Sequence, residues 1–217
     1  MTTYQRDVQK FIRLFPHVRQ YQSWDEANRG YVSGYFVSPS AEMSARYYQA
    51  LIRVCHGCTA IGLDVLDEYN ISKTLNYISE FKHWIGKLRT IMPRIWGLHN
   101  YSDVNRFESW RTREIVRALG GQVWLTETGG IVKFGGAFPN RNGSGLTRAA
   151  RVLRYMFALA HSVPHIARLY VYDWSGGNAS TRFDAGLTDI HHEPREGYVV
   201  VCRELHATHC GVRISRH

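Results

Sequence analysis

The sequence lacks any run of 18 apolar residues, the length that a membrane-spanning helix requires. Residues 1–11, "MTTYQRDVQKF", also lack the apolar core of a signal peptide. We therefore predict no membrane contact, and these features leave the cellular location open. Linkers and low-complexity segments are absent as well. With 44% apolar residues among 217, the chain can bury a substantial core, and we expect residues 1–217 to form one domain.

Basic runs and nucleic-acid-binding motifs are also missing, although the formal net charge is +9. The 27 Lys and Arg residues are spread along the chain, mostly within segments that have a helical pattern. A dispersed positive charge is typical of a solvated surface rather than of a phosphate-binding stripe. We therefore predict no nucleic-acid partner.

Cysteine is scarce, with four residues in the chain. Cys55 and Cys58 form a C-x-x-C motif, whereas Cys202 and Cys210 are more widely spaced than the tight pairs of a zinc site. The C-x-x-C motif follows a predicted helix, whereas a thioredoxin-like motif begins one. These positions indicate structural thiols or a local disulfide, and we predict no metal ion and no cofactor.

What the sequence does contain is a regular alternation of strand-like and helix-like segments. The predicted strands are 17–22, 59–66, 94–101, 122–128 and 166–174, and the predicted helices are 5–14, 41–55, 72–88, 106–121, 145–162 and 194–206. Ser40 and Ser72 are predicted N-caps, and Pro194 is placed at the first position of the last helix. Such alternation predicts an α/β fold with a parallel sheet and helical crossovers.

Loop length is concentrated after the strands, at 25–39, 127–144 and 174–193. In βα folds the loops after the strands build the active site. Two of these strand ends carry glutamates, Glu26 in "SWDEAN" and Glu127 in "LTETGG". A pair of carboxylates that faces one sugar is what glycoside hydrolysis needs. The sequence therefore predicts a glycosidase site.

Four strand-end segments resemble motifs of glycoside hydrolase clan A, the retaining (β/α)8-barrel glycosidases that include cellulases, mannanases and β-xylosidases. "SWDEAN" resembles the acid/base motif W-N-E-P/A-N at the end of barrel strand 4, and "LTETGG" resembles the nucleophile motif of strand 7. "LHNY" (98–101) and "YDW" (172–174) resemble the ends of strands 6 and 8. The four segments occur in the order that the clan requires and span nearly the whole chain.

The resemblance implies roles for individual residues. Glu26 would be the acid/base and Glu127 the nucleophile, with their carboxyl groups about 5–5.5 Å apart as in a retaining enzyme. Tyr101 would donate a hydrogen bond to Glu127, and Trp174 would be the platform beneath the bound sugar. The implied substrate-binding residues are Trp24, Asp25, Asn28, His99, Tyr101 and Trp174, of which Trp24 and Asn28 would hold the first loop. The partner would be a carbohydrate. From their positions in the sequence, Asp64 and Asp67 either line the mouth of the site or cap the following loop, and we favour the cap.

The sequence departs from the clan in two respects. Asp25 stands where the clan has an asparagine, and its charge is expected to raise the pKa of Glu26. If "SWDEAN" ends strand 4, strands 1 to 3 are absent, so a TIM barrel would be incomplete, with five βα units. Exposed edge strands would then favour self-association. The alternative to an active hydrolase is an inactive truncated fragment that binds carbohydrate at most.

Overall fold

The computed structural model of the protein describes residues 1–32, 35–36, 38–207 and 210. These residues form two compact units. Unit 1 contains residues 1–100, 110–126 and 165–168, and unit 2 contains residues 101–109, 127–164 and the described residues from 169 onward. The expectation of one domain stays a prediction.

The elements of unit 1 are mostly strand and helix in alternation. They are α1 (Thr2–Leu14), β1 (Gln20–Gln22), β2 (Tyr31–Val32), β3 (Tyr35–Phe36), α2 (Ala41–Val54), β4 (Thr59–Ile61), β5 (Asp64–Leu66), α3 (Ile71–Lys87), β6 (Ile95–His99) and α5 (Trp110–Leu119). Two strands begin in unit 1 and end in unit 2: β7 (Gln122–Thr128) and β9 (Ile166–Val171). Unit 2 also contains α4 (Tyr101–Val104), β8 (Lys133–Phe134), α6 (Ser144–Ser162), β10 (Phe183–Asp184) and α7 (Glu196–Glu204).

The strands pair as a βα fold requires. β1 is parallel to β4, with Gln20 opposite Thr59, and β5 is parallel to β6, with Asp64 opposite Gly97. The larger sheet has the order β5-β6-β7-β9. The chain therefore contains the five predicted βα units, which confirms the α/β class. Among the described residues β1 has a strand neighbour on one side, and self-association through this edge stays a prediction.

Several predicted element boundaries are confirmed. Ser40 caps α2, since its hydroxyl accepts a hydrogen bond of 3.2 Å from the backbone N–H of Met43. α5 ends before Gly120, whose φ of +62° suits a glycine better than any other residue. Among the described residues no helix has the length and apolar character needed to cross a membrane.

Other predicted boundaries are wrong. α3 begins at Ile71, so Ser72 lies inside its first turn, and the capping position is held by Asn70. Pro194 precedes the N-cap of α7, Arg195, rather than opening the helix. The predicted strand at 59–66 is divided into β4, which pairs with β1, and β5, which pairs with β6.

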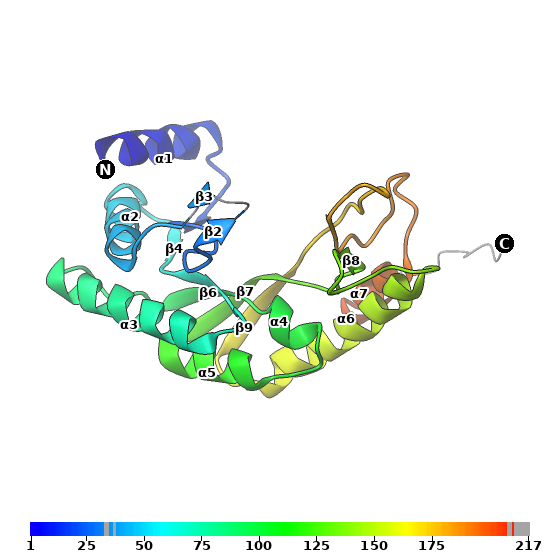
Figure 1. Cartoon of the computed structure of the whole chain (residues 1–217). Coiled ribbons are helices and arrows are strands. Elements are labelled where there is room, and N and C mark those ends of the chain that lie inside the picture. Colours follow the sequence, from blue (N-terminus) through cyan, green and yellow to red (C-terminus); the bar gives the residue numbers. More distant parts are fainter. Residues whose placement is uncertain (33–34, 37, 208–209, 211–217) are drawn as a thin grey trace. The chain divides into compact units, whose positions relative to one another are not determined.

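Trp96 lies at the centre of the core of unit 1. Its side chain is fully buried and packs edge-on against Phe81 of α3, with ring centroids 5.9 Å apart. The indole N–H donates to the backbone oxygen of Gly120 at 3.0 Å, so the polar atom of this large side chain is satisfied. Helix α3 packs against both α2 and α5 (Figure 1), and these helices cover the buried strands.

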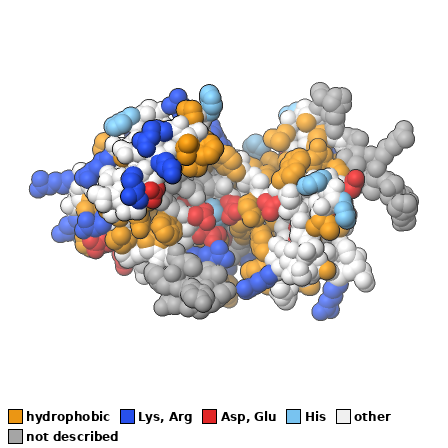
Figure 2. Space-filling view, turned by 90° about the horizontal axis from the view of Figure 1, so that it is seen from above, with side chains coloured by type: hydrophobic (Ala, Val, Ile, Leu, Met, Phe, Trp, Pro, Cys, Tyr) orange, Lys and Arg blue, Asp and Glu red, His pale blue; other side chains and the backbone are white. Residues whose placement is uncertain are grey.

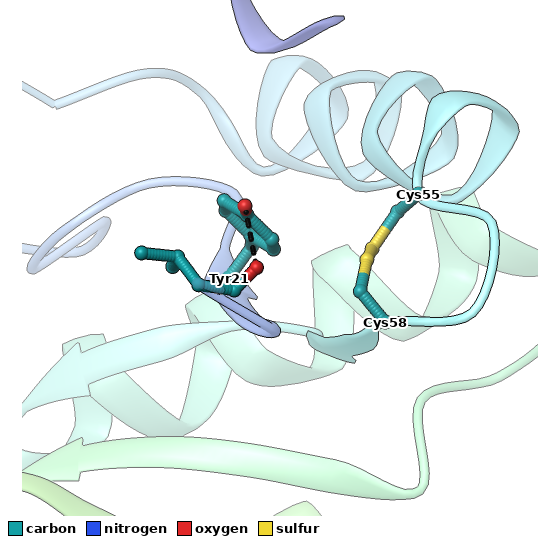
Figure 3. Close-up of a disulfide and its surroundings, with 4 residues drawn as sticks. Tyr21, Cys55 and Cys58 are labelled. Carbon is teal, nitrogen blue, oxygen red and sulfur yellow. Dashed lines mark hydrogen bonds between the residues drawn. A yellow bond between two sulfur atoms is a disulfide. The ribbon is translucent and has the colours of Figure 1, made fainter. Parts of the chain in front are cut away.

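All four cysteines form disulfides: Cys55 with Cys58 and Cys202 with Cys210. Cys55 is the C-cap of α2, and the first disulfide closes the turn from this helix into β4. Figure 3 shows this disulfide near Tyr21 of β1, whose hydroxyl donates to the backbone oxygen of Val18 at 2.9 Å. The local-disulfide interpretation of the C-x-x-C motif is confirmed, and it anchors a helix end to the strand that follows.

Unit 2 is built around the packing of α6 against α7 and a buried ion pair. Arg195 donates to both carboxylate oxygens of Asp184, at 2.8 and 3.0 Å. The segment "TRFDAGLTD" (181–189) makes Arg182 and Asp184 candidate internal partners, and this expectation is wrong. Arg182 is exposed and lies 5.6 Å from the ring of Phe134, whereas Arg195 approaches Asp184 from the start of α7.

We expect Arg195→Met to destabilise the protein, because it leaves the carboxylate of Asp184 buried without its cation. The free energy of unfolding should fall by about 3–5 kcal/mol. Urea unfolding measured by circular dichroism tests this. Arg117→Met is the matched control, since Arg117 pairs with Glu114 on an exposed helix face and should change stability by less than about 0.5 kcal/mol. Equal losses in the two variants would contradict the prediction.

Candidate active site

The loop that carries Glu26 is fastened to the strand beside it by backbone and side-chain hydrogen bonds. The hydroxyl of Ser23 donates to the backbone oxygen of Gly62 at 3.0 Å, and the N–H of Ala27 donates to that of Asp64 at 3.0 Å. These bonds continue the β1–β4 pairing beyond the last strand residue. The loop is therefore held rigidly at the carboxyl end of β1.

Asn28 completes this attachment. Its side-chain amide donates to the backbone oxygen of Leu66 and to the hydroxyl of Thr74, both at 2.9 Å, while its oxygen accepts from the N–H of Leu66 at 2.8 Å. All its hydrogen-bonding groups are thus used within the protein. Asn28 thus holds the loop, the role that the resemblance implies for it, and its contact with substrate stays a prediction.

Trp24 lies half-buried against a helix. Its ring is stacked on Tyr47 of α2 with centroids 5.1 Å apart, and Tyr47 in turn packs against Tyr4 of α1. Burial, followed by the neighbouring Tyr47, raises the pKa of Tyr4 to about 12. The Tyr4 hydroxyl donates to the backbone oxygen of Ser23 at 3.0 Å. Trp24 therefore supports the loop that carries Glu26.

Glu26 is 7% exposed and has a positive φ of 41°. Its Oε1 lies 3.1 Å from Nδ1 of His99, and its Oε2 forms an ion pair with Arg29. Burial raises the pKa of Glu26, but the hydrogen bond with His99 and the charge of Arg29 outweigh burial and lower it. The expected rise in the pKa of Glu26 is therefore wrong, because His99 forms a hydrogen bond with this carboxylate and Arg29 places a cation on it.

His99 is the last residue of β6 and is 2% exposed. Its two ring nitrogens face carboxylates on opposite sides. Nδ1 faces Glu26, whereas Nε2 lies 3.3 Å from Oδ1 of Asp64 and 3.7 Å from Oδ1 of Asp25. The structure thus places His99 against the predicted acid/base and brings Asp25 to the same ring.

The structure favours the alternative in which Asp64 lines the site. It is 1% exposed, and its Oδ2 accepts a hydrogen bond of 2.6 Å from the hydroxyl of Thr126 on β7. This contact spans β6 above Gly97, where a Cβ would lie 2.5 Å from Asp64 Oδ2 and 2.9 Å from Thr126 Oγ1. Assignment of Asp64 to a loop cap is therefore wrong. The signal in the sequence was the glycine in the middle of the apolar strand "IWGLH".

The other predicted site residues belong to unit 2. Glu127 is the next-to-last residue of β7 and is half-buried. Tyr101 is the first residue of α4, and its ring meets Phe183 edge-on at 5.8 Å. Trp174 follows β9, is 60% exposed, and lies 5.9 Å from Tyr198. The hydrogen bond from Tyr101 to Glu127 stays a prediction.

The glycines after Glu127 have a steric explanation. A Cβ at Gly129 would lie 2.1 Å from the backbone oxygen of Tyr172, and one at Gly130 would lie 2.3 Å from that of Ala149 in α6. Side chains at these positions would push β7 away from its neighbours. Glu26 is in unit 1 and Glu127 in unit 2, and the separation of 5–5.5 Å between their carboxyl groups stays a prediction.

Comparison with known proteins identifies the architecture. No protein-family model and no curated protein sequence matches the chain. Among solved structures it is similar to native xylanase 10B from Thermotoga maritima, with a TM-score of 0.62, 16% identity, 93% of this chain covered and 65% of that chain. A thermostable mutant of a xylanase from Cellvibrio japonicus gives a TM-score of 0.66, 15% identity and coverages of 93% and 69%. A fungal β-1,4-galactanase gives a TM-score of 0.66 and 12% identity, with 93% of this chain and 68% of that chain covered.

The chain has the fold of an incomplete (β/α)8 barrel, as found in these xylanases and galactanases. It spans 65% of the length of the Thermotoga maritima xylanase. The fold expected from the four strand-end motifs is therefore confirmed, and the resemblance to clan A is confirmed as a similarity of fold. That the chain corresponds to the C-terminal portion of these enzymes stays a prediction. At these identities the similarity concerns the glycosidase fold alone.

Asp173 gives this glycosidase fold a testable pH dependence. Burial, with the nearby charges of Asp184 and Glu127, raises the pKa of Asp173 above its ordinary value. Its Oδ1 is buried and accepts no hydrogen bond from any described residue. A raised folded-state pKa means that Asp173 favours folding below its unfolded pKa of about 3.9 and that this contribution is lost as the pH rises through the folded value.

We therefore expect Asp173→Asn to raise the free energy of unfolding at pH 7, and the difference from the parent to vanish near pH 3. Urea unfolding across this pH range measures it. Asp189→Asn should act with the opposite sign at pH 7, because hydrogen bonds from the N–H groups of Glu193 and His191 lower the pKa of Asp189. A destabilised Asp173→Asn protein at pH 7 would contradict the prediction.

Proposed function

We propose that the protein is a glycoside hydrolase that acts on a β-linked glycoside by a retaining double displacement. The observation that carries this proposal is the position of Glu26, held on a fastened loop at a strand end and contacted by His99 within a (β/α)8 glycosidase fold. The xylanases and galactanases with this fold make β-linked pentosides and hexosides the substrates to test. One solved neighbour, from Thermotoga petrophila, holds xylobiose.

In this proposal Glu127 attacks the anomeric carbon and Glu26 first protonates the leaving-group oxygen. Glu26 then removes a proton from the water that hydrolyses the glycosyl-enzyme intermediate. His99 positions the carboxylate of Glu26 through Oε1. Arg29 forms an ion pair with Oε2 of Glu26, and this ion pair must break before Oε2 can carry a proton.

The remaining roles also follow from placement. Trp174 presents an exposed indole after β9, and an exposed aromatic face suits the apolar face of a sugar. Tyr101 would orient Glu127. Trp24 and Asn28 hold the loop. The exposed side chain of Asp25 lies beside the ring of His99. No metal ion or cofactor takes part in these steps.

A second candidate function is carbohydrate binding without hydrolysis. Two observations favour it: both oxygens of Glu26 are engaged within the protein, and the chain spans 65% of the length of a similar xylanase. A nucleic-acid partner is not proposed, since Lys and Arg are scattered over the face shown in Figure 2 rather than gathered in a stripe. Carboxylates at the strand ends would also repel phosphates.

We expect Glu127→Gln to reduce hydrolysis of aryl β-xylosides and β-galactosides to background, because no covalent intermediate can form. Glu26→Gln should spare the first step with a good leaving group and slow the second by about 10²–10⁴-fold, which produces a burst. Stopped-flow release of the aryl group separates the two steps. Glu114→Gln, on an exposed helix face, is the control. Unchanged rates in Glu127→Gln would end the assignment.

Asp25→Asn tests the departure from the clan motif. An asparagine restores a neutral donor at this position, where an ionised aspartate can only accept. In an assay that contains a chelator, we expect kcat/KM of the Asp25→Asn variant for the same aryl glycosides to be higher than that of the parent.

If the parent hydrolyses neither glycoside but binds xylo-oligosaccharide by calorimetry, the binding function replaces the hydrolase.

A further inference from the structure

The face of His99 that points away from Glu26 is crowded with carboxylate oxygens. Nε2 lies 3.3 Å from Oδ1 of Asp64 and 3.7 Å from Oδ1 of Asp25. The ligand atoms of these three residues all lie within 4.8 Å of one another. A ring nitrogen carries at most one proton, so a single N–H cannot point well at both oxygens. Two negative charges thus share one imidazole nitrogen.

One buried carboxylate oxygen of Asp64 lacks a hydrogen-bond partner among the described residues. The residue is 1% exposed, and Oδ2 is satisfied by the hydroxyl of Thr126. Oδ1, which faces His99, accepts no hydrogen bond from any described residue. A buried carboxylate oxygen without a partner is costly, and a bound cation would remove that cost.

The surroundings of the three side chains match the outer shell of a metal site. A metal-bound histidine commonly donates its other ring N–H to a carboxylate, and Nδ1 of His99 lies 3.1 Å from Glu26. Metal-bound carboxylates are in turn hydrogen-bonded. Asp64 accepts from Thr126 at 2.6 Å, and Asp25 accepts from the side-chain amide of Gln22 at 3.0 Å. Each of the three side chains therefore has a partner that fixes its orientation.

The distances between the ligand atoms and the exposure of the cluster also suit a bound zinc ion. A tetrahedral zinc ion with bonds of about 2.0–2.2 Å holds its ligand atoms about 3.3–3.5 Å apart. The observed separations from Nε2, 3.3 and 3.7 Å, need only small adjustment. His99 and Asp64 form a buried floor, whereas the side chain of Asp25 is 68% exposed. A cation can enter from the side of Asp25 and keep a water molecule as its fourth ligand.

We propose that His99, Asp64 and Asp25 bind one first-row divalent cation, for which zinc is the best match. One imidazole with two carboxylates is a borderline donor set that suits zinc and disfavours magnesium and calcium, which prefer oxygen ligands alone. In this arrangement Nε2 binds the ion, and the proton of His99 stays on Nδ1 and is donated to Glu26. The site does not depend on hydrolytic activity.

Calorimetric titration of the chelator-stripped full chain with Zn²⁺ tests the proposal. We expect one site per chain, with affinity reduced at least about 10-fold by Asp25→Asn and further by Asp64→Asn. Mg²⁺ and Ca²⁺ should bind far more weakly. Asp25 is at the surface, so its variant should fold even if Asp64→Asn does not. A zinc-soaked crystal should show the ion about 2.0–2.2 Å from the three ligand atoms.

Matched controls separate this site from adventitious surface binding. Asp7→Asn removes an exposed carboxylate and His191→Gln an exposed imidazole, both outside the cluster, and both should leave the affinity unchanged. Absence of zinc binding in the parent would overturn the proposal. So would binding that survives Asp25→Asn and Asp64→Asn unchanged. Neither result bears on the proposed hydrolysis, which is assayed in the presence of a chelator.

Discussion

The arrangement at the strand ends depends on one interaction, the placement of His99 between Glu26 and Asp64. The imidazole joins a loop residue to a strand residue, and both carboxylates are buried with it. Burying a charge is costly unless it is paired. Glu26 is paired with Arg29, whereas Oδ1 of Asp64 faces His99 without accepting a hydrogen bond from any described residue. At one end of this row Thr126 of β7 donates a hydrogen bond to Asp64, and at the other end Arg29 forms an ion pair with Glu26.

This row can exist because the backbone leaves room for it. Gly97 lets the side chain of Asp64 reach across β6, and the hydrogen bonds of Ala27 and Asn28 to the neighbouring strand keep Glu26 in place. Glycines have a similar role in unit 2, where Gly129 and Gly130, which follow Glu127, allow close approach of the backbone of Tyr172 and Ala149. Glycines and strand-end polar residues together therefore shape the candidate site, while the apolar strands supply a rigid base.

The electrostatic balance of the row bears on both proposals. His99 and Arg29 keep Glu26 ionised in the free protein, which is unfavourable for a general acid until a substrate rearranges these contacts. The opposite side of His99 carries an excess of negative charge from Asp25 and Asp64. A cation at that side would leave the proton between His99 and Glu26 in place. Hydrolysis and cation binding can therefore be measured separately.

The sequence by itself determined the α/β class, the order of the five βα units and the positions of Glu26, His99 and Glu127 at strand ends, because hydrophobic periodicity and chain order are local properties. For Cys55 and Cys58 it left structural thiols or a local disulfide as alternatives, and the structure shows the disulfide. Only the tertiary structure decided that Arg29 lowers the pKa of Glu26, that Asp64 joins the site, and that Asp184 pairs with Arg195. These contacts depend on side-chain directions and on distances across strands, which residue spacing along the chain does not specify.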